Sequence, residues 1–101
     1  MVYDIKEENN MITKNMTIEL KQGLNARPVA VFVQVASRFE SSIFVEYENK
    51  KVNAKSIMGM MTLGIAAGEN VTVSADGADE TEAIQSIEEY LSNEKSIKNV
   101  G

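Results

Sequence analysis

The sequence predicts an α+β domain in which one mostly antiparallel, four-stranded sheet is covered on one face by three helices, in the order β-α-β-β-α-β-α. Three observations indicate this class. The chain has 101 residues, which is the size of one domain. Four short segments alternate apolar and polar side chains, as strands with one buried and one solvated face do. Helical segments with an apolar stripe lie between and after them.

The domain is expected to span residues 15 to 94. Residues 1 to 14 are polar and lack a sustained hydrophobic period, so they predict a flexible arm, and residues 95 to 101 predict a flexible tail. The first strand is predicted from Met16 to Leu20, where apolar and polar side chains alternate.

The segment from residue 29 to 39 is ambiguous, because valines at alternate positions favour a strand. Its polar positions favour a helix, since they recur at helical spacings. Asn25 is a good N-cap, and Pro28 falls in the first turn, where backbone N–H groups lack intrahelical acceptors anyway. A helix is therefore predicted, with an apolar stripe formed by Val29, Phe32, Val33, Ala36 and Phe39.

The remaining elements follow from turn signals and periodicity. Residues 42 to 47 and 51 to 54 predict a hairpin, and residues 71 to 75 a fourth strand. Asp79 and Glu82 resemble a capping box at the start of the last helix. The apolar stripe of that helix comprises Ala83, Ile84, Ile87, Tyr90 and Leu91.

Composition excludes several classes of function. The net charge is −5, and seven of fifteen acidic residues fall between Asp76 and Glu94, so a protein that binds nucleic acid directly through a basic face is not expected. The chain has no cysteine and no histidine, which removes disulfides, thiolate chemistry and histidine-based catalysis. No cofactor or metal site is predicted. An enzyme is not expected either, because no nucleophile and base stand at a motif spacing.

Nothing in the sequence directs the chain to a membrane. The segment MVYDIKEENN is acidic and has no long apolar stretch, so it does not resemble a secretory signal. No apolar run approaches the twenty or so residues that span a bilayer. The expected location is the cytoplasm.

The segment KSIMGMM, residues 55 to 61, holds three of the six methionines. A short surface helix can turn only part of its circumference toward a core. One interpretation assigns Ile57, Met60, Met61 and Leu63 to the core and leaves the rest as scattered exposed apolar residues. The other interpretation is an adaptable apolar patch that binds a partner.

Ser56 stands where the N-cap of this short helix is expected. Capping alone accounts for a serine there. A phosphate on its oxygen would also be well placed, because it would add nearly two negative charges at the positive end of a helix and beside lysines. Residues 21 to 55 hold six basic and three acidic side chains, so the neighbourhood of this serine is locally basic.

The segment GLNARP, residues 23 to 28, combines a glycine that can turn the chain, a helix-capping asparagine, an arginine and the one proline of the sequence. These residues outline an anion site at a helix N-terminus. Asn25 cannot act as a nucleophile through nitrogen, because its lone pair is delocalised into the carbonyl group.

GLNARP and KSIMGMMTLGIA together resemble two motifs of the HPr family, the small phosphocarriers of the bacterial phosphotransferase system, over about residues 16 to 92. The resemblance implies an HPr-like open-faced β-sandwich. In the family, a GxHARP loop presents a histidine that carries phosphate, with the following arginine assisting. Asn25 occupies that position here, whereas Arg27 and Pro28 match the motif.

This departure implies that histidyl phosphotransfer is lost. Ser56 matches the serine that HPr kinase/phosphorylase modifies in the family. A branch known as the catabolite-repression HPr, Crh, lacks the histidine and keeps this serine, and the sequence resembles that branch most. The resemblance then implies a phosphoprotein of carbon catabolite repression, a corepressor of a LacI-type catabolite control repressor. The implied partner contacts are Arg27, Lys55, Ser56, Ile57, Met58 and Met61.

Two other interpretations stay open. The chain could be a phosphocarrier whose histidine was replaced by Asn25 through engineering, or an interaction module that has lost both phosphate roles. A homodimer is compatible with the sequence, because strand exchange or pairing at a sheet edge leaves no clear mark in one sequence.

Overall fold

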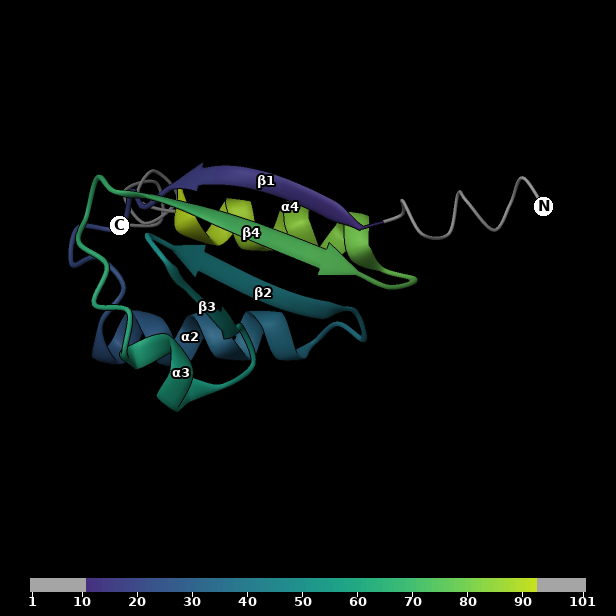
Figure 1. Cartoon of the computed structure of the whole chain (residues 1–101), viewed down its shortest axis with the longest axis horizontal. Helices are drawn as coiled ribbons and strands as arrows, with labels where there is room; N and C mark the ends of the chain where they lie inside the picture. Colours follow the sequence, from purple (N-terminus) through teal and green to yellow (C-terminus); the bar gives the residue numbers. More distant parts are fainter. Residues whose placement is uncertain (1–10, 93–101) are drawn as a thin grey trace, which may run out of the picture.

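The structure is a computed structural model in which residues 11 to 92 are described. Four strands form one sheet in the order β1-β4-β2-β3, and every neighbouring pair is antiparallel (Figure 1). The strands are β1 (Ile12–Thr17), β2 (Ser42–Tyr47), β3 (Lys50–Asn53) and β4 (Asn70–Asp76). The expectations for residues 1 to 10 and 95 to 101 lie outside the described residues.

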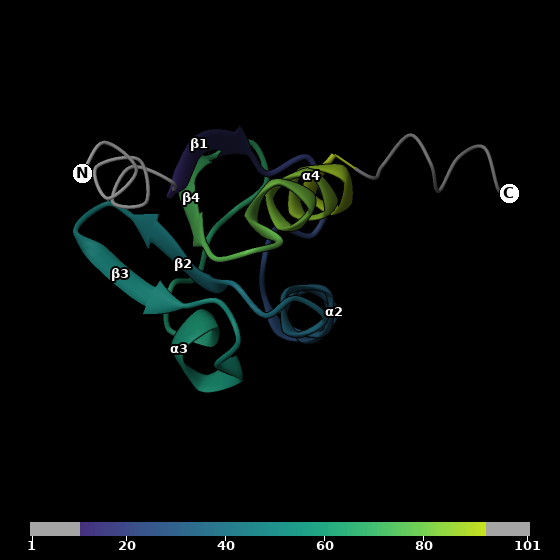
Figure 2. The same cartoon turned by 90° about the vertical axis from the view of Figure 1, so that its right-hand side faces the viewer.

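Three helices lie on one face of this sheet, while its other face is uncovered in the part of the chain that the structure describes (Figure 2). They are α2 (Ala26–Ser37), α3 (Ile57–Met61) and α4 (Glu80–Leu91). The predicted order of elements and the one-sided arrangement of the helices are confirmed. The segment from 29 to 39 is helical up to Ser37 despite its valines, because the stripe of Val29, Phe32 and Ala36 is fully buried.

The hydrophobic core lies between the sheet and the helices. The inward side chains of the two central strands alternate with outward ones as predicted, and α2 and α4 pack their apolar stripes onto them. Phe39 and Tyr90 are half-buried against this core, and Val35 joins it although the sequence had not placed it there. The buried inward residues of β2 and β4 are Ile43, Val45, Val71, Val73 and Ala75.

The predicted boundaries of the first strand were wrong. β1 begins at Ile12, so Ile12, Thr13 and Lys14 are not part of a flexible arm, and it ends at Thr17 rather than Leu20. Lys14 interrupts the alternation of apolar and polar residues that would reveal the strand. It is paired with Val73, so its side chain lies on the helix-covered face, where an apolar residue is expected. Its ammonium group avoids the core by reaching Glu88 of α4 at 2.8 Å.

The predicted capping box at the start of α4 was also wrong. Asp79 is the N-cap residue of α4, as predicted, but its side chain does not cap the helix. Its carboxylate makes no capping hydrogen bond to α4. It accepts hydrogen bonds from the hydroxyl of Ser41 and from the backbone N–H groups of Glu40 and Ser41. Asp79 therefore ties the start of α4 to the connection between α2 and β2.

Candidate functional site

The loop before α2 is held against the segment that precedes β4. Leu24 donates a backbone hydrogen bond of 2.8 Å to the carbonyl oxygen of Ile65. Gly23 has a φ of +70°, and a Cβ at this position would lie 2.5 Å from the same carbonyl oxygen. Only glycine permits this approach, so Gly23 fixes how the loop presents the residues that follow it.

Asn25 occupies the N-cap position of α2 with extended backbone, and its carbonyl oxygen accepts the first helical hydrogen bond, from Val29 at 2.8 Å. The predicted N-cap position is confirmed. The side chain makes no capping hydrogen bond, however, and it is exposed. The amide is thus exposed to solvent at the N-terminus of α2, and it offers no nucleophilic nitrogen.

Arg27 is exposed in the first turn of α2. Between residues 11 and 92, no hydrogen bond or salt bridge holds its guanidinium group. The backbone of this turn is held from the other side, because the hydroxyl of Tyr90 on α4 donates a 3.0 Å hydrogen bond to the carbonyl oxygen of Pro28. The ring of Tyr90 also lies 6.4 Å from that of Phe32. Arg27 is therefore an exposed cationic side chain without a partner among residues 11 to 92, on a well-anchored turn.

Ser56 is the N-cap of α3, as predicted. Its Oγ accepts a 3.0 Å hydrogen bond from the backbone N–H of Gly59, and its carbonyl oxygen accepts one of 2.9 Å from Met60. A Cβ at Gly59 would lie 3.2 Å from this Oγ, so the glycine leaves room beside the hydroxyl. The serine is half-buried, and its hydroxyl caps the helix in the unmodified protein.

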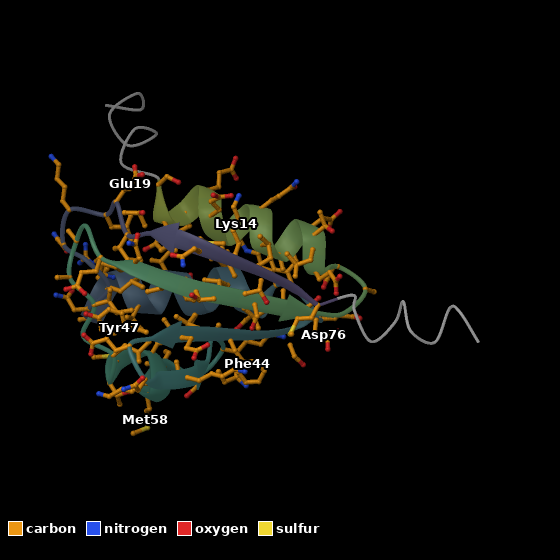
Figure 3. All side chains as sticks on the ribbon, turned by 45° about the horizontal axis from the view of Figure 1, so that its top comes forward. Lys14, Glu19, Phe44, Tyr47, Met58 and Asp76 are labelled. Carbon is orange, nitrogen blue, oxygen red and sulfur yellow. The ribbon has the colours of Figure 1, made fainter. Side chains whose placement is uncertain are left out.

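The short helix leaves three apolar side chains outside the core. Met60 and Leu63 are buried, but Ile57 is 48% exposed, Met58 81% and Met61 49%. The interpretation that placed Ile57 and Met61 in the core was therefore wrong. We call Ile57, Met58 and Met61 the α3 patch; Figure 3 shows Met58 extending from α3 away from the sheet. An exposed group of this kind is typical of a surface that binds a partner.

Lys55 lies beside Ser56 in the sequence, but its side chain is directed elsewhere. Its ammonium nitrogen donates a 2.7 Å hydrogen bond to the carbonyl oxygen of Phe39, just beyond the end of α2. Its backbone N–H donates to the side-chain oxygen of Asn53 at 2.8 Å. Lys55 thus links α3 to α2 and has two further N–H donors on its ammonium group.

The fold brings the predicted residues onto two neighbouring elements. Ser56 and the α3 patch lie on or next to α3, whereas Asn25 and Arg27 lie at the start of α2, and these helices pack side by side (Figures 1 and 2). The sequence analysis did not single out Val31 as an exposed apolar residue near Arg27. Val31 is 37% exposed on α2, one turn after Arg27. The signal was present, because residues four apart share a helix face.

Comparison with known proteins identifies the family. A family model described as the PTS HPr component phosphorylation site matches residues 12–93. The chain belongs to the HPr family. The match begins at the observed start of β1, four residues earlier than the resemblance in sequence had suggested.

Similar proteins include HPr-like proteins named Crh and phosphocarrier proteins HPr. The HPr-like protein Crh of Halalkalibacterium halodurans is 49% identical over 84 residues, which cover 83% of this chain and all of that protein. A solved structure of the phosphocarrier protein HPr from Bacillus anthracis has a TM-score of 0.80 and 47% identity, covering 82% of this chain and 99% of that one.

The crystal structure of Crh from Bacillus subtilis has a TM-score of 0.66 and 48% identity, covering 82% of this chain and 95% of that one. That structure is described as a dimer formed by swapping. In the described part of this chain, no helix has the length and apolar character to cross a membrane.

Proposed function

We propose that this HPr-like chain is a non-enzymatic regulatory protein of carbon catabolite repression in the cytoplasm. HPr kinase/phosphorylase phosphorylates Ser56, and the phosphorylated protein binds a LacI-type catabolite control repressor as its corepressor. One observation carries the proposal: this HPr family member has Asn25 where the resemblance to the GxHARP motif implies a histidine, while Ser56 has its hydroxyl beside an exposed apolar patch.

The absence of histidine supports the regulatory role over transport. The chain contains no histidine at all, so no imidazole nitrogen can take phosphate from the phosphoenolpyruvate-dependent enzyme. An asparagine amide cannot replace it, because its nitrogen is not nucleophilic. The protein is therefore not competent for histidyl phosphotransfer.

The surface around α3 has the chemistry that a phosphate-dependent partner needs. A phosphate on Ser56 would add an anchor for charge-assisted hydrogen bonds, and the α3 patch would supply apolar area to bury. Arg27 contributes a cation on the adjacent helix. Lys55 has a supporting role in this proposal, since part of its hydrogen-bonding capacity is used on Phe39.

The proposal is tested by offering both phosphate donors separately. The protein is incubated with phosphoenolpyruvate and the enzyme of the sugar-uptake system, and in a second reaction with ATP and HPr kinase. Intact mass and the acid stability of any phosphate are then measured. We expect one acid-stable phosphate from the kinase alone, absent in Ser56→Ala and retained in Ser37→Ala, which removes an exposed hydroxyl at the end of α2.

Each other outcome contradicts a defined part of the proposal. An acid-labile phosphate would indicate phosphotransfer and overturn the regulatory role. Phosphate that persists in Ser56→Ala would identify another serine. No uptake in either reaction would favour an interaction module without phosphate chemistry.

Repressor binding is tested with the phosphorylated protein. We expect Arg27→Ala to weaken binding about tenfold or more, because a charge-assisted contact is lost. Lys50→Ala serves as the matched control, since Lys50 is an exposed cation at the start of β3. Equal affinities of the two variants would remove Arg27 from the proposed contact.

A homodimer belongs to the same proposal. In the described sheet β1 is an edge strand that pairs with β4, so it can be exchanged between two copies without opening the centre of the sheet. The swapped dimer described for Crh from Bacillus subtilis supports this idea. Sedimentation velocity over a range of protein concentrations is expected to show a dimer, and a monomer throughout would contradict it.

A further inference from the structure

Three methionines stand within four residues in α3, and the fold gives their sulfur atoms very different access to solvent. Met58 is 81% exposed and Met61 is 49% exposed, whereas Met60 between them is completely buried. Figure 3 shows the Met58 side chain projecting away from the body of the protein. Oxidation of a thioether depends on access to its sulfur, so the fold exposes two of these methionines to oxidants and protects the third.

We propose that Met58 and Met61 form a reversible oxidation site at which a hydroperoxide weakens the binding of the α3 patch to its protein partner. The identity of that partner rests on the proposed function. In the reaction, a sulfur lone pair attacks one peroxide oxygen, a sulfur–oxygen bond forms and the oxygen–oxygen bond breaks. The leaving oxygen takes up a proton. The thioether is thereby oxidised by two electrons to a sulfoxide, and the hydroperoxide is reduced to water or an alcohol.

The sulfoxide alters the surface without altering the core. The fold of α3 does not depend on the exposed sulfurs, because Met60 and Leu63 hold this segment to the core and Ser56 caps it. The product has a polar oxygen where the thioether was apolar. Burying that oxygen against an apolar partner surface without a hydrogen-bond donor is unfavourable.

Two modifications would then act on one surface with opposite effects. Phosphate on Ser56 would add a charged anchor immediately before α3, and sulfoxide in the α3 patch would remove apolar contact area beside it. The phosphorylated protein would bind the repressor under reducing conditions and release it under peroxide stress. Methionine sulfoxide reductases would restore the original surface.

The chain contains its own controls for this inference. Met11, just before β1, is 52% exposed and so resembles Met61 in access, but it lies outside α3. Met16 is 4% exposed and represents a core methionine on the sheet, as Met60 does on α3. Site selectivity and effect on binding can therefore be separated within one protein.

The first measurement maps the sulfoxides. The folded, phosphorylated protein is treated with hydrogen peroxide, and each methionine-containing peptide is quantified by mass spectrometry over time. We expect Met58 to react first, Met61 and Met11 to follow at similar rates, and Met16 and Met60 to react only after unfolding. Oxidation of Met60 as fast as Met58 in the folded protein would overturn the inference.

The second measurement compares repressor affinity before and after peroxide. We expect the Kd of the phosphorylated wild type to rise about tenfold, as for loss of an apolar contact, and to recover after treatment with methionine sulfoxide reductase. In the double variant Met58→Leu and Met61→Leu, peroxide should leave the Kd unchanged, whatever its starting value. Met11→Leu should keep the full response of the wild type.

The outcomes separate this inference from the proposed function. Equal affinity of the oxidised and untreated wild type would overturn the inference alone. A response lost in Met11→Leu, or kept in the double variant, would overturn the assignment to α3. A phosphorylated protein that fails to bind the repressor before any peroxide is added would overturn the proposed function, and the inference with it.

Discussion

The ammonium group of Lys55 donates a 2.7 Å hydrogen bond to the carbonyl oxygen of Phe39, so the lysine next to Ser56 is anchored to the end of α2. Carbonyl groups at a helix C-terminus lack intrahelical donors, and a cation near that end is favourable. The contact joins the two helices that carry the candidate site. Lys55 therefore positions α3 as well as contributing charge.

The stability of the Lys55→Met variant tests this role. Loss of one hydrogen bond to a backbone carbonyl is expected to lower the free energy of unfolding by about 1 kcal/mol, measured by urea denaturation. Lys50→Met removes an exposed charge at the start of β3 and should change the free energy of unfolding by less than about 0.5 kcal/mol. Equal losses in both variants would show that the contact with Phe39 contributes nothing specific.

Gly59→Ala tests how closely the hydroxyl of Ser56 is surrounded. The added Cβ would lie 3.2 Å from Ser56 Oγ and 3.4 Å from Val52 Cβ, so the hydroxyl must shift. We expect kcat/KM for phosphorylation by HPr kinase to fall about tenfold, because misplacement of a reacting atom is costly. The free energy of unfolding should change by less than about 1 kcal/mol, since alanine favours a helix over glycine by a similar amount. An unchanged rate would contradict this geometry.

The hydrogen bond from the hydroxyl of Ser41 to the carboxylate of Asp79 is expected to make stability depend on pH. The hydroxyl of Ser41, followed by the backbone N–H of Glu40, holds the pKa of Asp79 below its ordinary value of 3.8. A pKa that is lower in the folded state stabilises the protein above pH 3.8, and this contribution is lost as the pH falls through the folded value. The Tm should therefore fall in acid.

Ser41→Ala removes the largest cause of this shift, so the fall of Tm below about pH 4 should be shallower than in the wild type. Ser42→Ala removes an exposed hydroxyl from the next residue and should keep the wild-type slope. Thermal unfolding followed by circular dichroism from acid to neutral pH provides the measurement. Identical slopes for all three proteins would mean that this hydrogen bond has no influence on acid stability.

Tyr90→Phe tests whether α4 holds the first turn of α2. The variant keeps the ring beside Phe32 but loses the 3.0 Å hydrogen bond to the carbonyl oxygen of Pro28. We expect the free energy of unfolding to fall by about 1 kcal/mol. Hydrogen exchange of the backbone N–H of Val29, which donates to the carbonyl oxygen of Asn25, should become faster.

Tyr47→Phe is the matched control for that variant. The hydroxyl of Tyr47 donates to the carboxylate of Glu69, a contact that raises the pKa of Tyr47 to about 12, and it lies at the end of β2 rather than at α2. This variant should leave exchange at the start of α2 unchanged. If both variants accelerate exchange there, the effect of Tyr90 is a general loss of stability.

Much of the site could be predicted because its signals are local. The loop before α2 is marked by Gly23, Asn25 and Pro28, which lie within six residues of each other. Ser56 directly precedes a short apolar segment. The loop and the N-cap positions of α2 and α3 were therefore predicted correctly. The boundary of β1 could not be predicted, because the inward position of Lys14 depends on Glu88, which is 74 residues away. The direction of the Asp79 carboxylate likewise depends on Ser41.

The sequence by itself determined the fold class, the starts of α2, α3 and α4, and the loss of histidine chemistry, since periodicity, caps and residue identity are properties of short segments. Only the tertiary structure decided which side chains of α3 stay outside, and where Lys55 and Asp79 direct their charges. Those choices depend on what packs against each residue. Five helical residues cannot all reach the core, and the contacts with α2 and β3 leave Met60 inside and Met58 in solvent.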